Sequence, residues 1–230
     1  MKKWVLICSF LLSFSTKAQE VTQGYCGPKD DDGNYGTKCE WNYDAESKTL
    51  KIWGDGEIYN SQGFDFPWRI NGYYDDIENI VIEEGITAIG SHAFYNASSL
   101  ENITMPDSLT SIGWNAFNGT TKLTSVIIPN SVTGIGGNST YPPFTETVTS
   151  LYCSEAQKNI CRQALEGSGL DVEEVLKTYQ KYGDKYFYDG KFYKSPNDIG
   201  TTNNIKKRIY TIDEANFVAG DKNRVSIRYR

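Results

Sequence analysis

Residues 77–94 decide the fold, and they read Ile77-Glu78-Asn79-Ile80-Val81-Ile82-Glu83-Glu84-Gly85-Ile86-Thr87-Ala88-Ile89-Gly90-Ser91-His92-Ala93-Phe94. The same pattern begins again at Leu100 and at Leu123, so both steps have a period of 23 residues. The third copy is irregular, because it ends at Phe144 and the pattern restarts at Val148. Apolar, glycine and Ala-Phe positions recur in register, which indicates a repeat architecture rather than chance similarity between hairpins.

Each copy combines a strand, a corner and a buried ring. Ile80 and Ile82 alternate with outward positions, which is typical of a short strand with one buried face. Pro106 and Pro129 follow the strands of later copies and end them, since proline cannot donate to a strand ladder. Glycine then permits a tight corner, and the ring of Phe94 enters the core. One copy cannot bury its own apolar face, whereas stacked copies can.

These features predict an α+β fold that is mostly β. We expect a short solenoid of repeats over residues 77–152, and a solenoid needs caps at both ends. Residues 19–76 are expected to form an N-terminal β cap, in which two strands flank a turn at residues 44–48.

The C-terminal part is expected to contain a helical cap and a small module. Residues 153–182 are predicted to hold one helix from Ser154 to about Leu165 and a second from Asp171 to about Tyr182. Residues 183–230 are predicted to form a basic α+β module that begins with a hairpin at residues 185–193, whose Asp-Gly turn is a strong hairpin signal. The module is expected to end with a short helix and a strand, Thr211–Ala219 and Arg224–Arg230.

Residues 1–18 have the features of a secretory signal peptide. Two lysines precede an apolar stretch at residues 4–14 that is too short to span a bilayer, and the small residue Ala18 ends the segment. We therefore expect export, with a mature chain that begins near Gln19. No later stretch is apolar enough for a transmembrane segment, so we expect a protein that is secreted, at the cell surface or in the periplasm.

Four cysteines remain after removal of the signal peptide: Cys26, Cys39, Cys153 and Cys161. An even number in an exported chain indicates two disulfides, for which three connectivities exist. Cys26 and Cys39 flank a short loop that can close on itself, so we expect them to pair. Cys153 and Cys161 lie about 10–12 Å apart if a single helix joins them, beyond the roughly 7 Å limit for a bridge. They pair only if the chain turns back between them.

Charge divides the mature chain into two parts. Residues 19–176 contain 8 Lys and Arg against 23 Asp and Glu, a balance of −15, whereas residues 177–230 contain 12 against 6, a balance of +6. Such a split indicates segments with different surfaces. Attraction between the two parts is one explanation, and a basic tail that binds an anionic envelope is another.

Few residues are candidates for chemistry. His92 is the one histidine, and its variable slot favours a surface turn residue over a catalytic one. The run from Asp30 to Asn34 has oxygen ligands but lacks the spacing of a calcium loop, which favours a solvated loop. We therefore expect no enzyme activity, no cofactor and no metal. Nucleic acid is not an expected partner, because the repeats are acidic and the chain is expected to be exported.

The repeat motif resembles the BspA-like leucine-rich repeats, on residues 85–94 and 106–117. The segments Leu50–Gly56 and Pro67–Trp68 are similar to the module that often precedes such repeats, and the likeness covers roughly residues 26–152. The resemblance implies a leucine-rich-repeat solenoid in an exported or surface protein that binds other proteins or host surfaces. It implies no reaction.

The strand residues between the buried ones point outward, and stacking aligns them on one sheet face. This face is uncharged in a strongly acidic segment, and its mixture of apolar and hydrogen-bonding groups suits a protein interface. The predicted partner-binding residues are Asn79, Val81, Asn102, Thr104, Ser125, Ile127, Ser150 and Tyr152. The alternative is that the C-terminal module covers this face, because basic and acidic segments attract.

The sequence therefore predicts an exported leucine-rich repeat protein that binds a protein or another cell-surface macromolecule through its repeat sheet. The alternative is a structural or envelope-associated protein that its basic C-terminal module holds in place. An enzyme would need a cleft with convergent polar groups, and the motifs for one are absent from the sequence.

Overall fold

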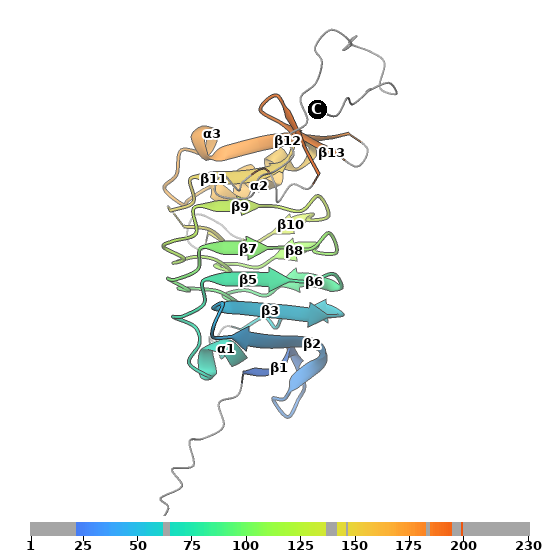
Figure 1. The fold of residues 1–230 in the computed structure, drawn as a ribbon, viewed down its shortest axis with the longest axis vertical. Helices are drawn as coiled ribbons and strands as arrows, with labels where there is room; N and C mark the ends of the chain where they lie inside the picture. The colour runs from blue at the N-terminus through green and yellow to red at the C-terminus, as the bar shows by residue number, and fades with distance from the viewer. Residues whose placement is uncertain are drawn as a thin grey trace, which may run out of the picture.

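The computed structural model describes residues 22–61, 65–136, 142–145, 147–182, 185–194 and 199. The repeats stack along the long axis of the molecule, with the N-terminal strands at one end and the C-terminal hairpin at the other (Figure 1). Each repeat supplies one strand to a long sheet surface and a second, shorter strand to a neighbouring sheet. The first strand is the one that the 23-residue period predicts, whereas the second lies where the sequence predicted only a corner. The predicted sheet-dominated α+β fold is confirmed.

The long sheet surface consists of two five-stranded sheets that lie edge to edge. In the first, β1 to β3 are antiparallel and β3, β5 and β7 are parallel. Its strands are, in order, β1 (Gln23–Lys29), β2 (Tyr35–Asp44), β3 (Thr49–Gly54), β5 (Asn79–Ile82) and β7 (Asn102–Thr104). In the second, β9, β11 and β12 are parallel and β12 to β14 are antiparallel. Its strands are β9 (Ser125–Ile127), β11 (Ser150–Ser154), β12 (Leu176–Tyr182), β13 (Lys185–Tyr188) and β14 (Lys191–Tyr193).

The shorter strands form a parallel sheet beside the first surface. Its order is β4 (Gly56–Glu57), β6 (Ile86–Ile89), β8 (Ser111–Ile112) and β10 (Gly134–Ile135). The helices are short and lie at the two ends of the stack, at α1 (Pro67–Ile70), the 3-10 turn η1 (Glu155–Gln157), α2 (Lys158–Leu165) and α3 (Val172–Val175). Among the described residues, no helix combines the length and apolar character needed to cross a membrane.

A column of stacked aromatic rings forms the centre of the core. Trp68 stacks on Phe94 at 5.6 Å between ring centroids, Phe94 on Phe117 at 5.4 Å, and Phe117 on Phe144 at 5.7 Å. All four side chains are fully buried. The recurring Ala-Phe pair therefore supplies one ring per repeat, and Phe144 continues the column where the third repeat is irregular. The column extends into the N-terminal cap through Phe66, which stacks on Trp68 at 5.4 Å.

The recurring corner glycines are required by close approach between repeats. A Cβ atom on Gly90 would lie 1.9 Å from the Tyr59 carbonyl oxygen, and one on Gly113 would lie 2.4 Å from the Ser91 nitrogen. These glycines do not have positive φ angles themselves. The left-handed residue of each corner lies two positions later, with φ of 63° at His92 and 53° at Asn115. The glycine therefore determines how closely adjacent repeats stack.

Gly113→Ala is expected to lower the free energy of unfolding by about 1–3 kcal/mol, because the added methyl group overlaps the backbone of the preceding repeat. Gly134→Ala is the matched control, since a Cβ atom there has nothing within 4 Å. Urea unfolding of the two variants measures the difference. Equal stabilities would show that the corner relaxes freely and does not limit repeat spacing.

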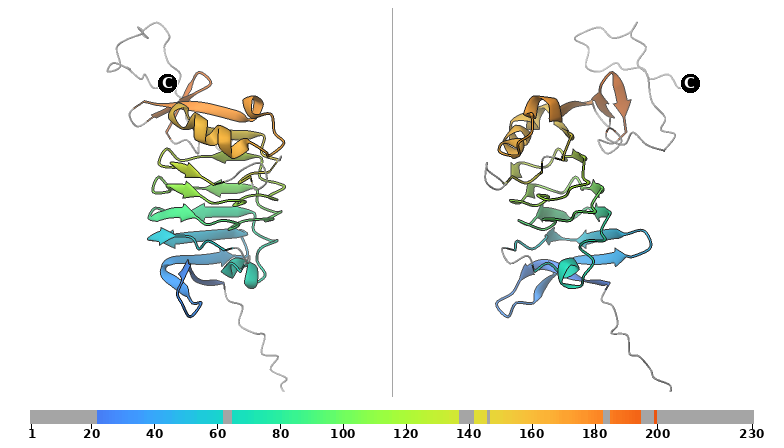
Figure 2. Two further views of the ribbon diagram at one scale, coloured as in Figure 1. Left: turned by 180° about the vertical axis from the view of Figure 1, so that it is seen from behind. Right: turned by 90° about the vertical axis from the view of Figure 1, so that its left-hand side faces the viewer.

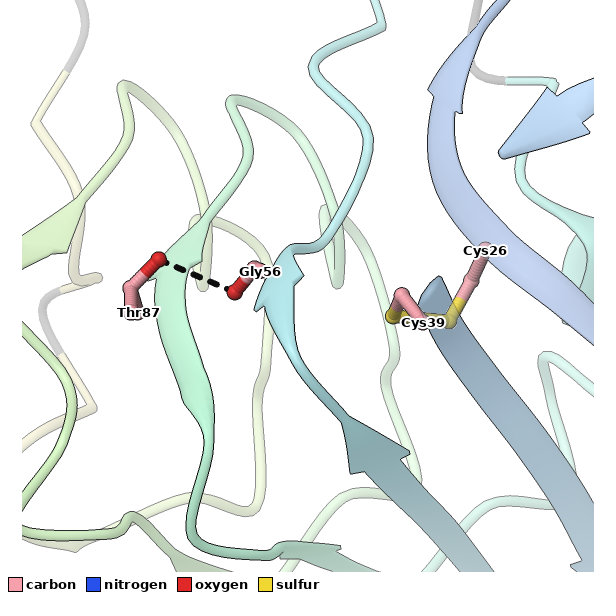
Figure 3. The surroundings of a disulfide bond; sticks show 4 residues. All are labelled: Cys26, Cys39, Gly56 and Thr87. Atoms are coloured by element: carbon pink, nitrogen blue, oxygen red, sulfur yellow. Dashed lines mark hydrogen bonds between the residues drawn. A yellow bond between two sulfur atoms is a disulfide. The ribbon is translucent and has the colours of Figure 1, made fainter. Parts of the chain in front are cut away.

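The N-terminal cap is closed by the expected disulfide. Cys26 on β1 and Cys39 on β2 are bonded, with 5.1 Å between their Cα atoms, and both are fully buried (Figure 3). The cap joins the solenoid through strand pairing, since β3 lies parallel to β5 and β4 parallel to β6. Thr87 strengthens this junction, because its hydroxyl donates to the Gly56 carbonyl oxygen at 2.9 Å (Figure 3).

The C-terminal end differs from the prediction in one element. Ser154 begins a helical segment that ends at Leu165, as expected. The second predicted helix is wrong beyond Val175: Asp171 caps one turn, and residues 176–182 form strand β12. Leu176 lies beside Leu151 in a parallel ladder with β11, so pairing with an available strand edge outweighs local helix propensity.

The predicted hairpin at residues 185–193 is confirmed, with Asp189 and Gly190 at its turn. It is continuous with the repeat sheet, because β13 pairs with β12, so the sheet crosses the boundary expected at residue 183. Helix α2 and the hairpin lie on opposite sides of the last strands (Figure 2, right). The signal peptide and the predicted helix and strand at residues 211–219 and 224–230 lie outside the described residues.

Candidate partner-binding surface

The eight predicted partner-binding residues lie on one face of the long sheet surface. Register places Asn79 beside Asn102 and Val81 beside Thr104. Ser125 lies beside Ser150, and Ile127 lies beside Tyr152. The residues that alternate with them point into the core, and those on β5, β9 and β11 are buried: Ile80, Ile82, Val126 and Leu151. We call the outward side of β5, β7, β9 and β11 the repeat face.

The side chains of the repeat face differ in how accessible they are. Asn102 and Thr104 are exposed, and the other six are half-buried. The asparagines form a ladder, because the Asn102 Nδ2 group donates to Asn79 Oδ1 at 3.0 Å and the Asn79 Nδ2 group donates to the Ser47 carbonyl oxygen at 3.2 Å. This ladder ties one margin of the face to the N-terminal cap and orients its amides.

Two lysines extend the repeat face at its ends. Lys51 on β3 lies beside Val81, and Lys177 on β12 lies beside Tyr152. Sequence reasoning missed Lys51 because β3 was assigned to the cap, although Leu50-Lys51-Ile52 follows the same alternation as the repeat strands. It missed Lys177 because that residue was placed in a helix.

Tyrosines of the C-terminal hairpin pack on the last strands of this face. Tyr188 meets Tyr152 edge-to-face at 5.2 Å, and Tyr186 meets Tyr179 at 5.5 Å. Tyr179 is fully buried, and its hydroxyl donates to the Ile128 carbonyl oxygen and to Asn130 Oδ1, each at 3.3 Å. The described hairpin therefore covers the face at its Tyr152 end, as the alternative expects of the C-terminal module.

Burial keeps Tyr179 and Tyr188 neutral. Desolvation is the largest cause that raises the pKa of Tyr179 above its ordinary value, and neighbouring Tyr186 adds to it. Desolvation also raises the pKa of Tyr188, with Tyr152 as the next contribution. Neutral phenols favour packing and hydrogen bonding over general base chemistry.

A groove of about 700 Å³ lies between the ends of the repeat strands and the hairpin. Residues that follow β5, β7 and β9 line one side, and the hairpin lines the other through Tyr186 and Lys194. The lining contains three carboxylates, Glu83, Glu84 and Asp107, around an apolar floor that includes Ile82, Met105 and Ile127. Because Thr104 and Ile127 also line this groove, it is continuous with the repeat face. We call it the acidic groove.

His92 has a structural position. Its ring nitrogen Nδ1 lies 3.2 Å from the Ser61 carbonyl oxygen, and Nε2 lies 3.2 Å from Nδ2 of Asn115 in the next repeat. A carbonyl accepts and an amide NH₂ donates, which assigns the proton to Nδ1. The ring therefore joins the N-terminal cap through Nδ1 to the next repeat corner through Nε2, and Asn115 occupies the slot that corresponds to His92.

The acidic loop at residues 30–34 binds its own backbone. Asp30 Oδ1 accepts from the backbone nitrogen of Asn34 at 2.8 Å and from that of Asp32 at 3.1 Å. The Asn34 hydrogen bond is the largest cause that holds the Asp30 pKa below its usual value. Across the described ranges no group of His, Cys, Asp and Glu is arranged to hold a metal ion.

Cys153 and Cys161 are free thiols in this structure, and both are fully buried. The chain does turn back between them, because Cys153 lies on β11 and Cys161 on α2. A hydrogen bond with Cys153, followed by burial, raises the pKa of the Cys161 thiol. Both groups therefore belong to the core that joins helix α2 to the last repeat.

These features define a class of protein: a short solenoid with two parallel strands per repeat and a phenylalanine column. The family model for the BspA type leucine-rich repeat region matches residues 72–195 in six copies, more than half of the chain. The protein therefore belongs to the BspA-type leucine-rich repeat family. The match continues past residue 152, where the sequence alone placed the end of the repeats, and it includes the hairpin.

Solved structures of bacterial leucine-rich repeat proteins are similar to this chain. One from Eubacterium ventriosum is 16% identical over 67% of this chain and 47% of its own, with a TM-score of 0.46. One from T. pallidum is 18% identical over 52% and 71%, with a TM-score of 0.29, and one from Bacteroides ovatus is 17% identical over 52% and 47%, with a TM-score of 0.26. This chain thus spans about half the length of the first. No curated protein matches it.

Proposed function

We propose that this protein is exported and binds a protein partner through the repeat face. The main support for this proposal is that the face presents a row of uncharged side chains, aligned in register, on an otherwise acidic solenoid. Interface centres are depleted in charge and combine apolar groups with hydrogen-bonding ones. Val81 and Ile127 supply the apolar contacts, while Asn102 and Thr104 supply exposed polar groups.

Membership of the BspA-type family supports a binding role, since such repeats serve protein interaction and are typical of secreted and surface proteins of bacteria. The rigid stack also supports it. Strand ladders and the buried phenylalanine column hold the face in one geometry, which lowers the entropy cost of binding. The signal-peptide features of residues 1–18 support export.

Changing Thr104 and Ile127 together to lysine is expected to weaken partner binding at least about tenfold, a loss of about 1.4 kcal/mol, because two charges must be desolvated at the centre of the interface. Candidate partners are captured with mature protein, residues 19–230, and the affinity of each purified partner is then measured for wild type and variant. Thermal unfolding verifies that the variant remains folded.

The matched control changes Ile70 and Ser98 to lysine. Both are exposed and lie away from the repeat face, so the same added charge is expected to leave the affinity unchanged. Equal weakening by both pairs would mean that net charge, rather than the face, governs binding. Binding that survives the Thr104 and Ile127 changes but disappears on deletion of residues 183–230 would place the site in the C-terminal module, as in the envelope-associated alternative.

A further inference from the structure

The acidic groove is open to an occupant that carries positive charge. Lys51 already pairs with Glu83, at 2.8 Å between Nζ and Oε1. The Glu84 carboxylate accepts from the backbone nitrogens of Asp107 at 2.9 Å and Ser108 at 3.0 Å, which fixes its position without neutralising its charge. Asp107 is exposed, and no cation among the described residues forms an ion pair with it. Asp107 and Glu84 therefore face the groove without a cationic partner among the described residues.

The chain itself leads from this groove into a basic segment. Lys194 lines the groove wall, and Ile199 is buried with Tyr179 and Tyr186 at the base of the hairpin. Residues 201–230 follow, with 7 Lys and Arg against 3 Asp and Glu, a balance of +4. The last seven residues, 224–230, alternate arginine or serine with Val225, Ile227 and Tyr229, which suits an extended segment with one apolar side.

We propose that residues 201–230 of this chain dock in the acidic groove of the same molecule. Basic side chains of the segment face Asp107 and Glu84, and its alternating apolar side chains pack on Ile127, which is half-buried in the groove lining. Salt bridges at a surface are individually weak. The tether compensates, because a segment attached at the groove has an effective concentration on the order of millimolar. Residues 201–230 span about 100 Å when fully extended, so the length of the segment does not restrict how it enters the groove.

Docking has a consequence for binding that rests on the proposed function. The segment would cover Thr104 and Ile127, which belong to the repeat face. A partner would then have to displace it, so its apparent affinity equals the intrinsic affinity multiplied by the fraction of molecules in which the face is free. The segment would act as a built-in competitor for the partner.

The test is hydrogen–deuterium exchange on the full mature chain without any partner, so it is independent of the proposed function. In wild type, amides within residues 201–230 are expected to exchange at least about tenfold more slowly than in Asp107→Lys, and 0.5 M NaCl is expected to remove much of this protection. Asp107→Asn, which preserves the size of the side chain, is expected to give a smaller loss. Glu46→Lys is the control, because Glu46 is an exposed carboxylate in the cap and away from the groove.

Three outcomes would overturn the proposal. Exchange of residues 201–230 at the rate of a free peptide in wild type would show that they do not dock. Protection that Asp107→Lys and Asp107→Asn leave unchanged would place the segment elsewhere. Protection that disappears on dilution would identify the occupant as the segment of a second copy. Failure of any of these kinds leaves the Thr104 and Ile127 test of partner binding unaffected.

Discussion

Phe117→Ala is expected to lower the free energy of unfolding by about 3–5 kcal/mol, the range for removing a buried aromatic ring from a core. Phe117 is fully buried between two other rings, at 5.4 Å from Phe94 and 5.7 Å from Phe144. The lost ring leaves a cavity at the interface between consecutive repeats. Repeat proteins depend on such interfaces for cooperativity, so we expect a broader unfolding transition as well as a lower midpoint.

Trp114→Ala provides the control within the same repeat. Trp114 is 51% exposed at the corner, so its removal is expected to cost less than about 1 kcal/mol although the side chain is larger. Urea unfolding followed by circular dichroism measures both variants. A Phe117→Ala loss no greater than that of Trp114→Ala would show that the column of rings does not hold the repeats together.

Removal of the cap disulfide is expected to cost about 3 kcal/mol, because the bond joins residues 13 apart and limits the freedom of the unfolded chain. The variant replaces Cys26 and Cys39 together with alanine, which avoids an unpaired thiol. Its stability is compared with that of wild type in the absence and presence of a reducing agent.

The reducing agent supplies the control for this experiment. It should destabilise wild type by a similar amount and leave the double variant unchanged, because the described cysteines Cys153 and Cys161 are already thiols in the structure. A wild-type stability that does not respond to reduction, with both half-cystines shown to be reduced, would contradict the assigned role of the bond.

Features that depend on nearby residues could be read from the sequence. The 23-residue period, the alternation within each strand and the recurring Ala-Phe pair predict the repeats, the outward side chains and the buried rings. Asp189-Gly190 predicts a tight hairpin because it accommodates left-handed backbone. The loop between Cys26 and Cys39 is short enough for the two cysteines to meet. In each case the determining interaction lies within one repeat or one turn, so a local pattern is sufficient.

Features that depend on which strand edges meet were decided by tertiary structure. Residues 176–182 have helical neighbours in sequence but join the free edge of β11, and Lys51 enters the repeat face only because β3 pairs with β5. The acidic groove combines Glu84 and Asp107, which follow strands β5 and β7, with Tyr186 of β13, far along the chain. No periodicity brings these residues together. The sequence by itself determined the repeat and its outward face; the packing of the chain's two ends onto that stack determined where the face is open.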